Sequence, residues 1–226
     1  MKRYMSERAS LSLLLSVLAL AMVLGGSVAR ADDLKLGSSY GENIYLDVGG
    51  NSTEYNGSPI SPSTLNGSSL AFVYCVDLFH TVGVPGDYNN TTVTSNGMVD
   101  GALVNNAGAI AWLLDNEVAG ATTADEQAGL QAAIWYEEYN YTMEAFTVGG
   151  NDAAAVAAYH ADLTALGSNT AALNTIDWFS PGVSGSNTVY QGLAGGPAVP
   201  EPMSILLLGT VLLCLPKLRQ KLTAGR

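Results

Sequence analysis

Phe72-Val-Tyr-Cys-Val-Asp-Leu78 is the stretch of sequence that most constrains the fold. β-Branched and aromatic residues dominate it, and with its neighbours it predicts a strand from Leu70 to His80. Alternate side chains of a strand share a face, so Cys75 is expected on one face and His80 on the other. On this prediction, His80 does not reach the Cys75 thiol directly.

Leu130-Gln-Ala-Ala-Ile-Trp135 is the second informative stretch, and it lies in a pattern typical of an amphipathic helix. The helix is expected to be capped by Thr122 or Thr123 and to end near residue 139. Small side chains beside Gln131 would let the Cys75 strand approach the helix closely. At helical spacing, the stripe that contains Gln131 also contains Ala124, Ala128 and Trp135.

The order of the predicted elements is strands, then helices, then strands. This order predicts an α+β fold in which a helical subdomain is inserted into a β-sandwich or barrel subdomain. A loop rich in Asn, Ser, Gly and Pro is expected over 49–69, and a polar connection over 89–96. The expected strands cover 44–48, 70–80, 175–179 and 188–193, and the expected helices cover 103–118, 123–139 and 152–166.

The first 31 residues have the pattern of a secretory signal peptide. Lys2, Arg3 and Arg8 precede an apolar run from Leu11 to Leu24, and small residues flank the expected cleavage site before Asp32. We therefore expect the chain to be exported and the mature domain to cover residues 32–198.

Residues 199–226 have the pattern of a second targeting segment. Val199-Pro-Glu-Pro202 precedes an apolar run of 13 residues from Met203 to Leu215, and a basic tail follows. As a helix this run spans roughly 20 Å, less than a hydrocarbon core of about 30 Å. The segment resembles the PEP-CTERM sorting signal of Gram-negative bacteria. The resemblance implies transient insertion into the inner membrane, processing by an exosortase, and release to the cell surface or extracellular matrix.

The mature segment is strongly acidic. Residues 32–198 contain 18 of the 20 acidic residues and one basic residue, Lys35, so their net charge is 1 − 18 = −17. Such a surface repels nucleic acid and anionic membranes, so nucleic-acid binding is excluded. Cys75 is the only cysteine of this segment, because Cys214 lies in the sorting tail. An internal disulfide is therefore excluded, and the lone thiol calls for another explanation.

The two stretches, their order and their separation of 131 − 75 = 56 positions resemble the thioester domains of bacterial surface adhesins. The resemblance covers about Phe72 to Leu193. In that family, a cysteine thiol and a glutamine amide condense with loss of ammonia into an internal thioester, which then acylates a nucleophile on another molecule. The resemblance assigns these roles to Cys75 and Gln131. The surrounding pocket residues would be Tyr74, Asp77, Ala128, Trp135 and Tyr136.

A thioester domain binds its partner covalently and stoichiometrically, and so is not an enzyme. The expected partner is a surface protein or an exopolysaccharide that offers an amine or a hydroxyl, and attachment within a biofilm matrix is the expected role. A thioester must be shielded from bulk water, and its formation needs donors aimed at the developing oxyanion. The sequence leaves the choice between amine and hydroxyl open.

Two other classes of function stay open at this stage. The chain could be a cysteine hydrolase or transglutaminase, with Cys75 as nucleophile, His80 or His160 as base, and Asp77 or Asp162 orienting the base. Alternatively, it could be a non-reactive matrix protein in which Cys75 is part of the core. No cofactor is expected. Two histidines 80 positions apart and no Cys/His cluster give no prediction of a metal site.

Overall fold

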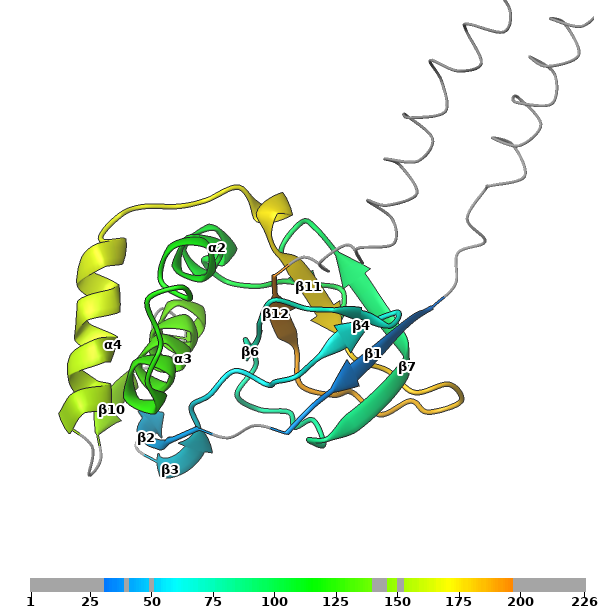
Figure 1. The fold of residues 1–226 in the computed structure, drawn as a ribbon, viewed down its shortest axis with the longest axis horizontal. Coiled ribbons are helices and arrows are strands. Elements are labelled where there is room, and N and C mark those ends of the chain that lie inside the picture. The colour runs from blue at the N-terminus through cyan, green and yellow to red at the C-terminus, as the bar shows by residue number, and fades with distance from the viewer. Residues whose placement is uncertain (1–30, 39–40, 49–50, 140–145, 150–152, 197–226) are drawn as a thin grey trace, which may run out of the picture. The chain divides into compact units, whose positions relative to one another are not determined.

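The computed structural model describes residues 31–38, 41–48, 51–139, 146–149 and 153–196 (Figure 1). Apart from Ala31, the predicted signal peptide lies outside the described residues, and so does the predicted sorting segment. Among the residues that are described, no helix combines the length and the apolar character that crossing a membrane would require.

The main element is a curled antiparallel sheet in which strands distant in the sequence are neighbours (Figure 1). Its order is β5-β4-β1-β7-β11-β12-β6, so the first strand of the domain lies next to the long β7, and β6 lies at the edge. The strands are β1 (Asp32–Leu36), β4 (Thr64–Leu65), β5 (Ser68–Ser69), β6 (Val73–Cys75), β7 (Gly86–Thr94), β11 (Asp177–Ser180) and β12 (Leu193–Gly195).

The helices are inserted between two parts of this sheet. After the small hairpin of β8 (Met98–Val99) and β9 (Ala102–Leu103), the chain forms α2 (Ala107–Asn116), α3 (Ala124–Tyr139) and α4 (Ala153–Leu166). It then returns to the sheet through a short 3-10 helix (Leu173–Thr175). A second sheet, in the order β10-β2-β3, contacts α3 and consists of β2 (Asn43–Val48), β3 (Asn51–Asn56) and β10 (Phe146–Gly149).

The structure confirms the α+β class and the insertion of the helices, and its main sheet is curled. Each predicted helix is found within a few residues of its expected bounds. The start of α3 is capped by Thr123, as expected: its Oγ1 accepts a hydrogen bond from the Glu126 N–H at 3.3 Å. In return, Glu126 Oε2 accepts a hydrogen bond from the Thr123 N–H at 2.8 Å.

Several strand predictions were wrong. The strand predicted over 70–80 is regular only from Val73 to Cys75, and the one predicted over 188–193 begins only at Leu193. The polar connection predicted over 89–96 is largely the strand β7, and the loop predicted over 49–69 contains β3, β4 and β5. In β7 the apolar alternation is broken because a bulge sets Asp32 and Leu34 of β1 opposite Thr91 and Tyr88.

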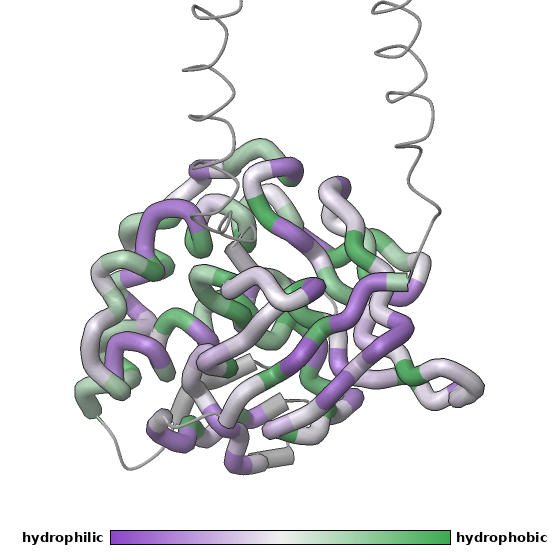
Figure 2. The backbone as a smooth tube through the Cα atoms, turned by 45° about the vertical axis from the view of Figure 1, so that its right-hand side comes forward, coloured by the Kyte–Doolittle hydropathy of each residue, from purple (hydrophilic) through white to green (hydrophobic). Residues whose placement is uncertain are grey.

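The hydrophobic core joins the helices to the curled sheet. Trp178 and Phe179 on β11 and Leu34 on β1 have no exposed surface, and residues of α2 and α3 pack with them in one cluster. Hydrophilic and hydrophobic residues are interspersed along the elements (Figure 2), as expected where each element buries one side. The fully buried residues of the two helices are Ile110, Ala111, Leu113, Ala128, Leu130, Gln131, Ala132, Ala133 and Ile134.

Candidate functional site

The amide of Gln131 is hydrogen-bonded to the backbone of Cys75 in both directions. The Cys75 N–H donates to Gln131 Oε1 at 3.0 Å, and Gln131 Nε2 donates to the Cys75 carbonyl oxygen at 2.7 Å. The Gln131 side chain is fully buried, and Cys75 is 9 % exposed. The two residues that the sequence singled out, 56 positions apart, are therefore in direct contact.

This pairing exists because β6 is an edge strand. Of the strands in the described ranges, β6 pairs only with β12, and an edge strand has backbone groups that need partners elsewhere. Gln131 supplies one donor and one acceptor to Cys75, and the N–H of Ile60 donates to the Val73 carbonyl oxygen at 2.8 Å. The helix thus satisfies the edge of the sheet through a side-chain amide that imitates a neighbouring strand.

Close packing on both sides of α3 fixes the position of Gln131. A Cβ atom added to Gly57 would lie 2.7 Å from the Cβ of Ala128, and one added to Gly129 would lie 2.6 Å from the Cβ of Ala158. Only glycine allows such approaches, so Gly57, just after β3, and α4 hold the helix from two directions. Ala128 is buried against Gly57, whereas the small residues beside Gln131 had been expected to admit the Cys75 strand.

The Cys75 thiol is a buried, free cysteine. Burial raises the pKa of the thiol to about 12, and the negative charge of Asp77 adds to the rise. At neutral pH Cys75 is therefore protonated in this state, and it lacks the activated thiolate of a typical cysteine enzyme. The Cys75 N–H donates to Gln131 Oε1, the oxygen that would carry the negative charge of a tetrahedral intermediate at Cδ.

A cavity of about 230 Å³ adjoins Cys75. Its walls are mainly apolar and aromatic, and they include Tyr55 and Trp135, whose ring centroids lie 5.6 Å apart. None of the described residues that line it is Asp, Glu, Lys or Arg. The described residues that line it are Tyr55, Asn56, Ser58, Ile60, Cys75, Leu78, His80, Thr81, Val82, Val84, Trp135 and Gln191.

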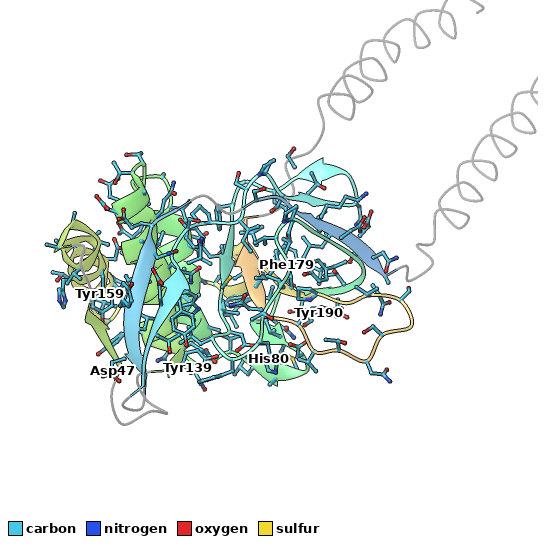
Figure 3. The ribbon with its side chains drawn as sticks, turned by 90° about the horizontal axis from the view of Figure 1, so that it is seen from below. Asp47, His80, Tyr139, Tyr159, Phe179 and Tyr190 are labelled. Atoms are coloured by element: carbon cyan, nitrogen blue, oxygen red, sulfur yellow. The ribbon has the colours of Figure 1, made fainter. Side chains whose placement is uncertain are left out.

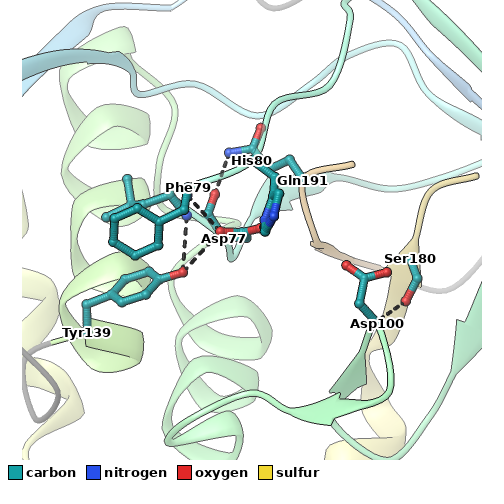
Figure 4. A network of polar contacts seen from close by, with 8 residues as sticks. Asp77, Phe79, His80, Asp100, Tyr139, Ser180 and Gln191 are labelled. Atoms are coloured by element: carbon teal, nitrogen blue, oxygen red, sulfur yellow. Dashed lines mark hydrogen bonds and ion pairs between the residues drawn. The ribbon is translucent and has the colours of Figure 1, made fainter. Parts of the chain in front are cut away.

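His80 also lines this cavity, and Asp77 holds its imidazole ring in place (Figure 4). His80 Nδ1 lies 2.5 Å from Asp77 Oδ2. The other carboxylate oxygen accepts hydrogen bonds from the Phe79 N–H at 2.7 Å and from the Tyr139 hydroxyl at 3.2 Å. The Asp77 side chain is 18 % exposed and that of His80 is 47 % exposed, so a fixed carboxylate orients a ring that solvent can reach.

The prediction that His80 lies on the face opposite to Cys75 was wrong. It assumed a straight strand to residue 80, whereas β6 ends at Cys75 and the chain then bends. The Asp77 carbonyl oxygen accepts a hydrogen bond from Gln191 Nε2 at 2.5 Å, and the Leu78 N–H donates to the Tyr139 hydroxyl at 3.2 Å. These contacts fix the bend that brings His80 to the same cavity as Cys75.

The other predicted pocket residues are divided between three places. Trp135 lines the cavity beside Cys75, as expected. Tyr74 is buried but lines a different cavity, because it alternates with Cys75 along β6. Tyr136 packs against Tyr159 of α4, with ring centroids 5.9 Å apart.

The alternative base and its partner lie elsewhere. His160 is exposed on α4 and its ring contacts Tyr159, which Figure 3 places away from His80. Asp162 faces Glu117 and Glu126 in a separate cavity between α3 and α4. Of the two sets considered for a cysteine enzyme, only His80 and Asp77 are near Cys75.

Trp135 carries a polar group that the described part of the chain leaves unsatisfied. Its side chain is 1 % exposed, and no hydrogen-bond partner is found for Nε1. Buried indole N–H groups usually have a partner, so this unpaired one is an exception among the described residues.

Sequence reasoning missed three residues of the site: Tyr55, Tyr139 and Gln191. Tyr55 lies in a segment predicted to be loop, and Gln191 precedes a strand whose start was misplaced. Tyr139 is the last residue of α3, where a side chain is usually assigned to solvent. No spacing pattern links these positions, and only the folded chain brings them beside Asp77 and Cys75.

No protein-family model matches the sequence, and the comparisons with curated proteins and with solved structures likewise yield no match. Among the residues that the structure describes, no three or more His, Cys, Asp or Glu side chains gather where they could hold a metal ion. The function is therefore argued from the geometry around Cys75.

Proposed function

We propose that Cys75 and Gln131 form an internal thioester through which this exported protein attaches covalently to a partner at the cell surface or in the extracellular matrix. The observation that carries the proposal is the reciprocal pair of hydrogen bonds between the buried Gln131 amide and the backbone of the free cysteine. It supports the thioester-domain resemblance of the sequence.

Formation of the bond would be a condensation. Cys75 Sγ attacks Gln131 Cδ, the Cys75 N–H stabilises the oxyanion on Oε1, and the C–N bond then breaks. Ammonia leaves with the proton of the thiol, and a thioester is the product. The burial of both residues supports this step, because enclosure slows the competing hydrolysis.

Attachment would consume the thioester once per molecule. A nucleophile on the partner attacks Cδ of Gln131, the C–S bond breaks, and Cys75 is released as a thiol. The partner would be a surface protein or an exopolysaccharide. The proposed export, exosortase processing and surface location rest on residues 1–31 and 199–226 of the sequence.

The test is the intact mass of the purified full chain. A thioester predicts a mass lower than the sequence mass by one ammonia, and the deficit should be absent in Cys75→Ala and in Gln131→Ala. Gln127→Ala is the matched control, because Gln127 lies one turn earlier on α3 and bonds the Ala121 carbonyl oxygen instead. Methylamine should then add its own mass to the wild type at Gln131. A full sequence mass in freshly purified wild type would refute the proposal.

A cysteine hydrolase or transglutaminase is the second candidate, because His80 and Asp77 are near Cys75. The raised pKa of the buried thiol argues against it. Repeated release of product from an acyl substrate, more than one equivalent per chain and lost in Cys75→Ala, would favour the enzyme over stoichiometric attachment.

A further inference from the structure

We propose that the nucleophile captured at this site is a hydroxyl of a neutral carbohydrate, and that His80, oriented by Asp77, is the general base that deprotonates it. This inference rests on the proposed thioester and specifies its partner. Four features of the cavity beside Cys75 support it: a base, a positioning carboxylate, a lining without charged side chains, and an aromatic wall.

The base is defined by its hydrogen bond. A carboxylate can only accept, so the 2.5 Å contact with Asp77 Oδ2 places the proton of the neutral imidazole on Nδ1. Nε2 then carries the lone pair. Because the ring is half exposed and also lines the cavity of Cys75, it can meet a hydroxyl that arrives from solvent on its way to the thioester.

A general base matters more for a hydroxyl than for an amine. An unprotonated amine is already a strong nucleophile, whereas an alcohol attacks a thioester fast only when its proton is removed during the attack. An oriented His–Asp pair therefore accelerates attack by a hydroxyl more than attack by an amine that is already unprotonated. The pair therefore favours a hydroxyl acceptor.

The lining of the cavity favours a neutral partner. No Asp or Glu is among the described residues that line it, and the neighbouring Asp77 carboxylate is already bonded to His80, Phe79 and Tyr139. The lining residues provide instead the apolar rings of Tyr55 and Trp135 and the hydroxyls of Ser58 and Thr81. A sugar offers apolar C–H faces to the rings and hydroxyls to the polar side chains.

The reaction is balanced without a cofactor. His80 Nε2 takes the proton of the hydroxyl as the oxygen bonds to Gln131 Cδ. The C–S bond breaks, and the imidazolium returns the proton to the leaving Cys75 sulfur. The products are a glutamyl ester of the sugar and a free thiol, which the apolar surroundings keep protonated.

The test compares a hydroxyl probe with an amine probe on protein that carries the ammonia deficit. Methyl glucoside and methylamine are added separately, and mass spectrometry follows the ester and amide adducts. His80→Ala and His80→Gln are expected to lower the rate with methyl glucoside by about tenfold or more, because a general base typically contributes about 10²–10⁴-fold. The rate with methylamine should change much less. Added imidazole should restore the ester rate of His80→Ala, and Asp77→Asn should lower it without abolishing it.

Each outcome decides the question. His160→Ala removes the exposed histidine of α4 and should leave both rates unchanged. A wild type that has the deficit and reacts with methylamine but forms no ester with methyl glucoside would overturn the carbohydrate proposal and leave the thioester standing. An unchanged ratio of ester to amide rates in both His80 variants would overturn the role of His80. A wild type without the deficit would overturn the thioester itself, and this inference with it.

Discussion

At the scale of the residue, the site depends on the side-chain amide of Gln131, which forms the hydrogen bonds that the backbone of a neighbouring strand would form. Gln131 satisfies both backbone groups of Cys75 at a sheet edge, and the same contact places its carbonyl carbon against the residue whose thiol would attack it. One interaction therefore closes the sheet and, under the proposed function, would also prepare the chemistry. The two roles can be separated experimentally.

Gln131→Ala is expected to destabilise the fold even when no thioester can form. In a Cys75→Ala background it should lower the free energy of unfolding by about 1–3 kcal/mol, because two buried backbone groups lose their partner. Urea unfolding followed by circular dichroism would measure the difference. Gln127→Ala in the same background should cost much less, since its amide is only half-buried. Equal costs for the two variants would show that Gln131 does not support the edge of the sheet.

At the scale of the element, the position of α3 is set by glycine. Replacing a glycine in a helix interior with alanine usually stabilises a protein by up to about 1 kcal/mol. Gly129→Ala should do the opposite, because its Cβ would lie 2.6 Å from both the Cβ of Ala158 and the backbone nitrogen of Tyr159. We expect a net loss of stability, since overpacking costs about 1–3 kcal/mol. Urea midpoints would test this, with Gly120→Ala as a neutral control. A more stable Gly129→Ala would contradict the close packing of α3 on α4.

The start of α3 predicts a pH dependence of its own. Hydrogen bonds from Thr123 and Thr122 lower the pKa of the Glu126 carboxyl. A carboxyl whose pKa is lowered on folding stabilises the protein above its unfolded pKa, and the effect is lost as the pH falls through the folded pKa. The urea midpoint of wild type should therefore exceed that of Glu126→Gln near pH 6, and the two should converge in acid. A difference independent of pH would contradict the capping role of the carboxylate.

At the scale of the whole molecule, buried carboxyl groups make stability depend on pH in the opposite direction to the Glu126 cap. Burial raises the pKa of Glu138 to about 8 and that of Asp162 to about 7, and the charges of Glu117 and Glu126 add to the rise at Asp162. Between the ordinary carboxyl pKa and these values, the folded chain binds more protons than the unfolded chain. Stability must therefore fall as the pH rises through this range.

Thermal unfolding between pH 5 and pH 8 would test this balance, with the melting temperature expected to be higher at pH 5. Glu138→Gln should flatten the profile, because it removes a carboxyl that must ionise in a buried position. Glu54→Gln is the matched control, since Glu54 is exposed on β3. A wild-type melting temperature that rises with pH would contradict the prediction.

The sequence by itself determined the local features. The three helices and a threonine cap at Thr122 or Thr123 follow from spacing and residue type, which act over a few positions. Cys75 and Gln131 were singled out by the resemblance of the two stretches that contain them. The limits of the strands were predicted less accurately. A bulge breaks the alternation of β7, and contacts with distant residues shorten β6.

Only the tertiary structure decided how these parts meet. It made β6 an edge strand, and Gln131 became the hydrogen-bond partner of the backbone groups on that edge. It also bent the chain after Cys75, so that His80 lines the same cavity as Cys75, contrary to the prediction from the sequence. The physical reason is that both outcomes depend on contacts between residues far apart in the sequence, among them Gln191 with Asp77 and Tyr139 with Leu78. Periodicity describes which way a side chain points along one element, and it carries no information about what lies across from it.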